Sequence, residues 1–110
     1  MDITERRTAD IVTLSLSGKL DTTTAKTFEE RMLAHIEAGD RRFIIDLALL
    51  DYISSAGLRV FLLAAKRLES GKGKIVLCSL KNPVGEVFDI AGFSSIFSVY
   101  GSHDEAMKGL

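Results

Sequence analysis

Apolar and polar side chains alternate strictly from Ile11 to Ser17. The apolar positions are Val12, Leu14 and Leu16, and the polar positions are Thr13, Ser15 and Ser17. A period of two is typical of a strand that buries one face. We therefore predict a strand here, ended by Gly18. An earlier strand is expected over Ile3–Thr8, with Ala9–Asp10 as the turn of a hairpin.

Further along the chain, apolar residues recur at spacings of three and four, the period of a helix with one buried face. The first helix is predicted over 24–38, with Ala25, Phe28, Met32 and Ile36 buried. The second begins at Ser54 or Ser55 and reaches Ser70, with a stripe of Leu58, Phe61, Leu62, Ala65 and Leu68. A third helix opens at Asn82–Pro83, and a capping box, Ser102-x-x-Glu105, predicts a short fourth.

Short apolar runs between these helices predict further strands over 42–47, 74–79 and 96–100. The run 42–47 is apolar on both faces, which is typical of a strand in the centre of a sheet. The order β-β-α-β-α-β-α-β-α combines a hairpin with helical crossovers, and it therefore predicts a mixed sheet packed against α-helices. We expect the 110 residues to form a single α/β domain, 1–110.

Composition narrows the class of protein. The 14 basic and 15 acidic residues give a net charge of -1, without the basic surface that a nucleic-acid binder needs. The first residues lack the apolar core of a signal peptide, and no apolar run approaches the roughly 20 residues of a membrane span. Cys78 is the one cysteine, and we interpret it as core packing. We expect a cytoplasmic domain that needs no metal or cofactor.

The segment Asp51–Arg59 follows the predicted central strand and leads into the second helix. In open α/β sheets this kind of corner is where ligands and partners usually bind. Two adjacent hydroxyls, of Ser54 and Ser55, lie at the helix start, where unpaired N–H groups favour negative charge. A serine here can carry a phosphate, although either serine can equally serve only as the helix cap.

The stretch Asp-Tyr-Ile-Ser-Ser-Ala-Gly-Leu at 51–58 resembles the signature of the STAS family, and specifically of bacterial anti-sigma factor antagonists. Gly18-x-Leu20-Asp21, the run 43–47 and Gly92-Phe93 extend the resemblance along the whole chain. The resemblance implies a regulatory switch. The unphosphorylated antagonist binds an anti-sigma factor, often also a serine kinase, and so frees the sigma factor. Phosphorylation ends the binding, and a PP2C-type phosphatase restores it.

The phosphoacceptor follows from the same resemblance. Many relatives use the hydroxyl directly before the glycine, but here that position is Ala56, which cannot be phosphorylated. Other relatives with Ser-Ala-Gly use the serine before the alanine, which matches Ser55. Ser54 stands where the family commonly has aspartate, and it is the alternative acceptor.

Other residues near this corner are expected to shape the partner surface: Asp21, Asp51, Tyr52, Gly57 and Arg59. Asp21 can equally cap the first helix. Asp46 and Asp51 are expected to flank the exit of the central strand, and Gly57 to allow close backbone approach.

Catalysis by the chain itself is not expected. Neither of its two histidines, His35 and His103, belongs to a local arrangement of serine and carboxylate residues that resembles a catalytic triad. Neither a nucleophile elbow nor a phosphate-binding loop occurs.

Two other functions stay open: a non-switching STAS interaction module of a scaffold or lipid-transport assembly, and a STAS domain that binds a small ligand such as a nucleotide. The oligomeric state is open as well.

Overall fold

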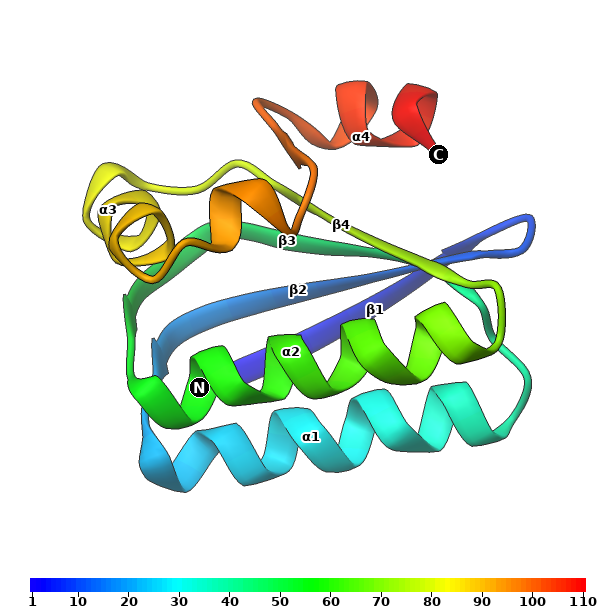
Figure 1. Ribbon diagram of the computed structural model, residues 1–110, viewed down its shortest axis with the longest axis horizontal. Coiled ribbons are helices and arrows are strands. Elements are labelled where there is room, and N and C mark those ends of the chain that lie inside the picture. The colour runs from blue at the N-terminus through cyan, green and yellow to red at the C-terminus, as the bar shows by residue number, and fades with distance from the viewer.

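The structure, a computed structural model, describes residues 1–110. The elements occur in the predicted order (Figure 1). The strands are β1 (Asp2–Thr8), β2 (Ile11–Leu20), β3 (Arg42–Ile53), β4 (Lys74–Cys78) and β5 (Val99–Tyr100). The helices are α1 (Thr22–Glu37), α2 (Ser55–Ser70), α3 (Asn82–Ile90) and α4 (His103–Gly109), with a 3-10 turn, η1, at Phe93–Ser95.

The five strands form one sheet in the order β1-β2-β3-β4-β5. β1 and β2 pair antiparallel as a hairpin, whereas β2–β3, β3–β4 and β4–β5 are all parallel. The predicted mixed sheet with β3 at its centre is therefore confirmed.

Two layers of helix cover the sheet. α1 and α2 lie side by side on one face, and α4 lies on the other (Figure 1). The main core lies under α1 and α2, where the rings of Phe28 and Phe61 are 5.1 Å apart. A smaller cluster under α4 joins Ile44, Val76 and Cys78 to Ala106. Cys78 is fully buried, which confirms its assignment to the core.

Two strands are longer than the sequence pattern predicts. β2 continues past Ser17 through Gly18, which adopts a φ of +91°, to Leu20. β3 extends to Ile53 rather than ending at residue 47. Its pairing with β2 shifts register twice, because β3 carries an extra residue at each shift. Each shift interrupts the alternation of buried and exposed side chains along β3. The hydrophobic pattern therefore does not predict the second half of the strand. Asp46 therefore lies within β3, and only Asp51 lies near its exit.

The predicted strand 96–100 is also wrong in extent. Phe93–Ser95 forms η1, Phe97 turns into the core, and only Val99 and Tyr100 pair with β4. On α2 the buried face is rotated from the predicted stripe, because Val60 and Ala64 are buried while Leu58, Leu62 and Ala65 are half-buried. α1 begins at Thr22, two residues before the predicted start, because Asp21 caps it.

Candidate functional site

Ser54 connects the end of β3 to the start of α2 and is held at three points. Its backbone N–H donates to the Leu20 carbonyl at 2.9 Å, which fastens the corner to the end of β2. Its Oγ accepts a hydrogen bond from the Gly57 N–H at 3.3 Å, and its carbonyl accepts one from Leu58 N–H at 3.0 Å. Ser54 is therefore the N-cap of α2, one of the two assignments that the sequence left open.

Ser55 is the first residue of α2 and has different surroundings. Its side chain is exposed and makes no hydrogen bond. It lies at the helix end where backbone N–H groups lack partners and the helix dipole favours negative charge. Ser55 therefore presents a free hydroxyl at a position that tolerates an anion.

Gly57 permits the close packing that the sequence predicts for it. A Cβ atom built on Gly57 would lie 2.8 Å from Leu20 Cγ and 3.0 Å from Ile53 Cγ1. Real side chains almost never approach so closely, so the first turn of α2 can lie this near the ends of β2 and β3 only with glycine at 57.

Asp21 lies beside this corner because β2 and β3 are neighbouring parallel strands that end together, with Leu20 opposite Ile53. Its Oδ1 accepts hydrogen bonds from the N–H groups of Thr23 and Thr24, both at 3.0 Å. The hydrogen bonds from Thr24, followed by that from Thr23, lower the pKa of Asp21. Asp21 is therefore an ionised helix cap, and it carries a negative charge next to Ser54.

Asp51 and Tyr52 are exposed near the carboxyl end of β3. Arg59 is exposed on α2, one helical turn after Ser55. The Asp51 carboxylate forms an ion pair with Lys81, the residue that precedes α3. This contact of Lys81 was not predicted from the sequence, because no local sequence pattern indicates that two residues 30 positions apart lie close together. The pair ties the corner to α3.

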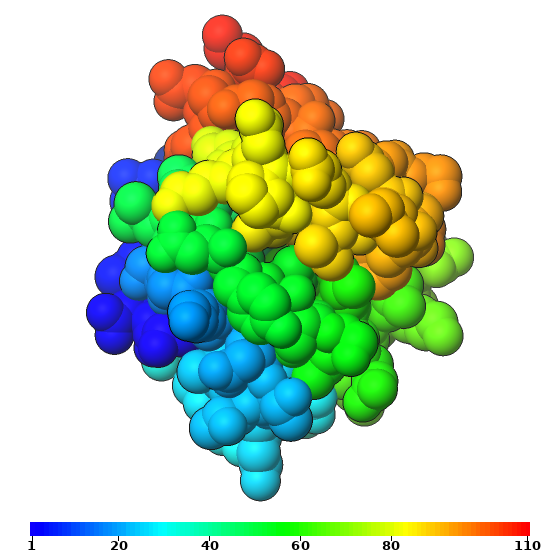
Figure 2. Space-filling model, turned by 90° about the vertical axis from the view of Figure 1, so that its left-hand side faces the viewer, coloured from blue at the N-terminus to red at the C-terminus, as the bar shows by residue number.

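These elements meet on one face of the molecule. Figure 2 shows the start of α1 in light blue, the start of α2 in green and α3 in yellow lying next to one another. The predicted site residues come from the ends of β2 and β3 and from the starts of α1 and α2, which parallel strands bring to one edge of the sheet.

Neither histidine belongs to this face by its contacts. His35 lies between the carboxylates of Glu5 and Asp40, and His103 contacts the hydroxyl of Thr13. No group of histidine, cysteine and acidic side chains is arranged to hold a metal ion. None of the helices combines the length and apolar character required to cross a bilayer.

Comparison with known proteins gives a consistent result. Residues 2–106 match the STAS domain family. BtrV of Bordetella bronchiseptica, named as a candidate anti-sigma factor antagonist, is 44% identical over 106 residues, which are 96% of this chain and 91% of BtrV.

Solved structures share the fold. A candidate antagonist from Thermotoga maritima has a TM-score of 0.93 at 22% identity, over 97% of this chain and 92% of that one. The unphosphorylated form of the antagonist SpoIIAA has a TM-score of 0.87 at 21% identity, over 99% and 98% of the two chains. The family match and the identity to BtrV together establish the family that the sequence resemblance indicated: this chain belongs to the STAS domain family.

Proposed function

We propose that this chain is an anti-sigma factor antagonist whose binding is switched by a phosphate on Ser55. In the unphosphorylated form it binds an anti-sigma factor that is also a serine kinase, and so releases the sigma factor. Phosphorylation ends the complex, and a PP2C-type phosphatase restores the binding form. The names of BtrV and of SpoIIAA, both described as antagonists, support the assignment of partner class.

The observation that carries the proposal is the contrast between the two serines. The Ser54 hydroxyl is half-buried and engaged with the Gly57 N–H, whereas the Ser55 hydroxyl is exposed and free. A kinase can reach Ser55 without breaking the helix cap. Ser54 is the alternative acceptor, and its phosphorylation would disrupt the hydrogen bond by which its hydroxyl caps α2.

Phosphorylation here needs only a hydroxyl from this chain. The Ser55 Oγ attacks the γ-phosphorus of ATP, ADP leaves, and the hydroxyl proton passes to a base of the kinase, which also supplies Mg²⁺. SpoIIAA has been solved in a phosphorylated form that keeps the same fold as this chain, with a TM-score of 0.79. That likeness supports a modification that leaves the fold in place.

The phosphate would act at the contact surface. It adds about -1.5 to -2 charges and three acceptor oxygens. Asp21 already places a negative charge beside the corner, whereas the Asp51 carboxylate is paired with Lys81. A phosphate on Ser55 would add its charge to that of Asp21. A partner surface that packs closely on uncharged Ser55 would then face a bulky anion, with steric clash and uncompensated desolvation.

The test uses the intact chain with candidate serine kinases and Mg·ATP, followed by mapping of the phosphosite by mass spectrometry. We expect phosphate on Ser55 in the parent and in Ser54→Ala, and none in Ser55→Ala. Ser55→Asp should keep its circular dichroism spectrum and lose affinity for the anti-sigma factor, while Ser55→Ala binds constitutively. Phosphate found on Ser54 alone would move the switch to the alternative residue.

A different result would favour the non-switching module. If no serine is modified, and Ser55→Asp binds the partner as tightly as the parent, the corner is a structural cap and phosphorylation has no part in binding. Pull-down of scaffold or transporter subunits in place of a kinase-like ATPase would then identify the class of assembly.

A further inference from the structure

Three large apolar side chains are exposed along the segment that runs from the end of α3 to β5. Ile90, Ile96 and Val99, at the end of α3, after η1 and in β5, are 88%, 55% and 46% exposed. Only two other large apolar side chains of the molecule, Leu49 and Tyr52, are exposed, and both come from β3. Ile96 and Val99 line one groove, and contiguous apolar exposure of this kind marks interaction surfaces.

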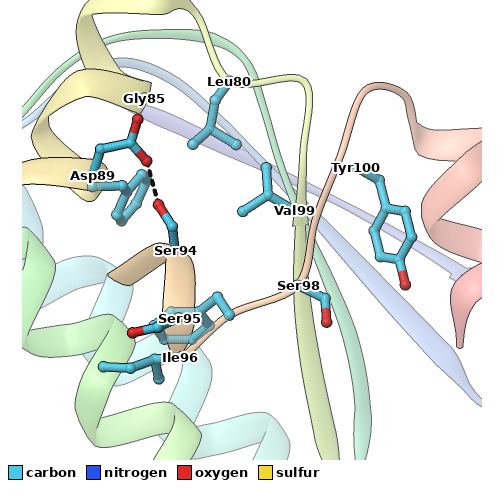
Figure 3. A pocket seen from close by; sticks show the side chains of 11 residues that line it. Leu80, Gly85, Asp89, Ser94, Ser95, Ile96, Ser98, Val99 and Tyr100 are labelled. Carbon is cyan, nitrogen blue, oxygen red and sulfur yellow. Dashed lines mark hydrogen bonds between the residues drawn. The ribbon is translucent and has the colours of Figure 1, made fainter. Parts of the chain in front are cut away.

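Ile96 and Val99 line a groove of about 620 Å³ between α3, η1 and β5, which we call the α3–β5 groove. Leu80 provides further apolar lining (Figure 3). The buried ring of Phe88 lines the groove as well. This volume falls within the range of about 300–1,000 Å³ that is typical of binding pockets.

Asp89 is the one charged residue that lines the α3–β5 groove. Its carboxylate accepts a hydrogen bond from the Ser94 hydroxyl, so that α3 and η1 are joined at the groove (Figure 3). No lysine, arginine or histidine lies within ion-pair distance of Asp89. The groove therefore combines apolar walls with one uncompensated negative charge, and a basic side chain with apolar neighbours is its complement.

The groove also borders an open sheet edge. The Leu77 N–H donates to the Ser98 carbonyl at 3.0 Å, and the Ser79 N–H donates to the Tyr100 carbonyl at 2.9 Å. Backbone groups alternate in direction along a strand, so Val99, between these two residues, turns its N–H and C=O away from β4. β5 is the last strand of the sheet, and these two groups are free to pair with an added strand.

We propose that the α3–β5 groove is a second protein-binding surface. It takes an extended segment of a partner protein that pairs with Val99, places apolar side chains over Leu80 and Phe88, and brings a lysine or arginine to Asp89. Strand addition of this kind gains affinity from main-chain hydrogen bonds and specificity from side-chain pockets. The groove does not include Ser54 or Ser55, so this proposal is independent of phosphorylation.

The probes are two blocked peptides, acetyl-Val-Lys-Val-Lys-Val-amide and its counterpart with glutamate in place of lysine. Each is titrated into the ¹⁵N-labelled intact chain, with amide shifts followed by NMR. We expect the lysine peptide to shift the amides of Asp89 and of residues 94–100. The glutamate peptide should bind about tenfold more weakly, the factor expected when one charge-assisted hydrogen bond is lost.

Matched variants locate the charge preference. Asp89→Asn removes the proposed contact without changing shape, and the two peptides should then bind equally. Glu86→Gln removes the same charge from an exposed position of α3 outside the groove, and the preference for lysine should survive. Val99→Ser, which removes apolar surface from the groove wall at an exposed site without adding a charge, should weaken binding of both peptides.

Three outcomes would overturn the proposal. The first is the absence of shifts at residues 94–100, and the second is equal binding of both peptides to the parent chain. The third is a concentration-dependent shift of the groove amides without peptide, together with dimer mass in light scattering, which would assign the groove to a second copy of this chain.

Discussion

Ser54 and Ser55 are adjacent, yet the backbone gives their hydroxyls opposite tasks. Ser54 has extended backbone angles, which turn its oxygen back over the first helical turn toward the Gly57 N–H. Ser55 is already helical and points outward. One residue therefore fixes the start of α2, and the next is left available for chemistry.

This division predicts unequal effects on stability. Ser54→Ala removes the cap and should lower the free energy of unfolding by about 1 kcal/mol. Ser55→Ala removes a hydroxyl without a partner and should change it by less than about 0.5 kcal/mol. Urea unfolding of the two variants and the parent measures both values. Equal losses would show that Ser55 contributes to the cap as well.

Gly57 and Gly85 provide a matched pair of helical glycines. We expect Gly57→Ala to cost about 1–3 kcal/mol, because its methyl group would press on Leu20 at 2.8 Å and on Ile53. A Cβ on Gly85 would approach nothing closer than Leu80 Cβ at 4.0 Å. Gly85→Ala should therefore raise stability by about 0.5–1 kcal/mol through helix propensity alone. Thermal unfolding distinguishes the signs, and a stable Gly57→Ala protein would contradict the close packing of α2.

At the scale of elements, a charged cluster fastens β1 and α1 to the loop before β3. The Asp40 carboxylate accepts two hydrogen bonds from the Arg7 guanidinium, at 2.9 and 3.0 Å. The ring of His35 lies between two acids, with Nδ1 2.9 Å from Asp40 and Nε2 3.1 Å from Glu5. Arg31 also pairs with Glu5. Five side chains from three segments therefore form one continuous network.

Stability should depend on pH through Asp40. Hydrogen bonds from Arg7 first, and then from His35, lower the pKa of Asp40 from 3.8 to about 2. A lowered pKa means that the stabilisation is complete above pH 3.8 and is lost as the pH falls toward 2. Asp40→Asn should therefore lower the free energy of unfolding by about 1 kcal/mol near neutral pH. At a pH of about 2, where Asp40 of the parent is itself becoming protonated, the loss should be much smaller.

Urea unfolding of parent and variant across this pH range measures the difference. Asp2→Asn is the control, because Asp2 is exposed and makes no ion pair, and its effect should stay small throughout. A difference between parent and Asp40→Asn that does not vary with pH would exclude the ionised carboxylate as its source.

Hydrophobic periodicity predicts those strands and helices in which buried and exposed positions recur at a regular spacing from end to end. The order of strands and helices, and the place of β3 in the sheet, follow from short regular stretches. The second half of β3 does not, since two extra residues relative to β2 leave Leu49 exposed where alternation suggests burial. β5 is overestimated for another reason: Phe97 is apolar because it packs into the core, and it pairs with no strand.

The candidate site was predictable in part. Parallel strands bring their carboxyl ends to one edge, so the proximity of Asp21 to Ser54 follows from the element order. The contact of Asp51 with Lys81 depends on the path of the chain into α3, and local patterns carry no information about that path. The α3–β5 groove is hidden for the same reason, because its lining comes from a strand end, a helix and a 3-10 turn.

At the scale of the whole molecule, the reactivity of the Cys78 thiol should measure how often the whole domain unfolds. It is fully buried between the sheet and α4, and burial raises the pKa of its thiol to about 11. Native Cys78 should therefore resist thiol reagents, and its labelling rate should follow global unfolding. Ser70→Cys, at an exposed position of α2, should react at once. Rapid labelling of the native parent with an aromatic disulfide would reveal local opening of α4.

The order of the strands in the sheet is also their order in the chain. Each strand therefore adds to an edge formed by the strand before it, and no early strand must wait for a late one. During synthesis on a ribosome, the sheet can grow in the direction in which the chain emerges. The hydrogen bonds that hold Ser54 to Leu20, Gly57 and Leu58 all belong to the part of the chain that is made first. The corner proposed to receive the phosphate can thus take shape while the second protein-binding surface is still being translated.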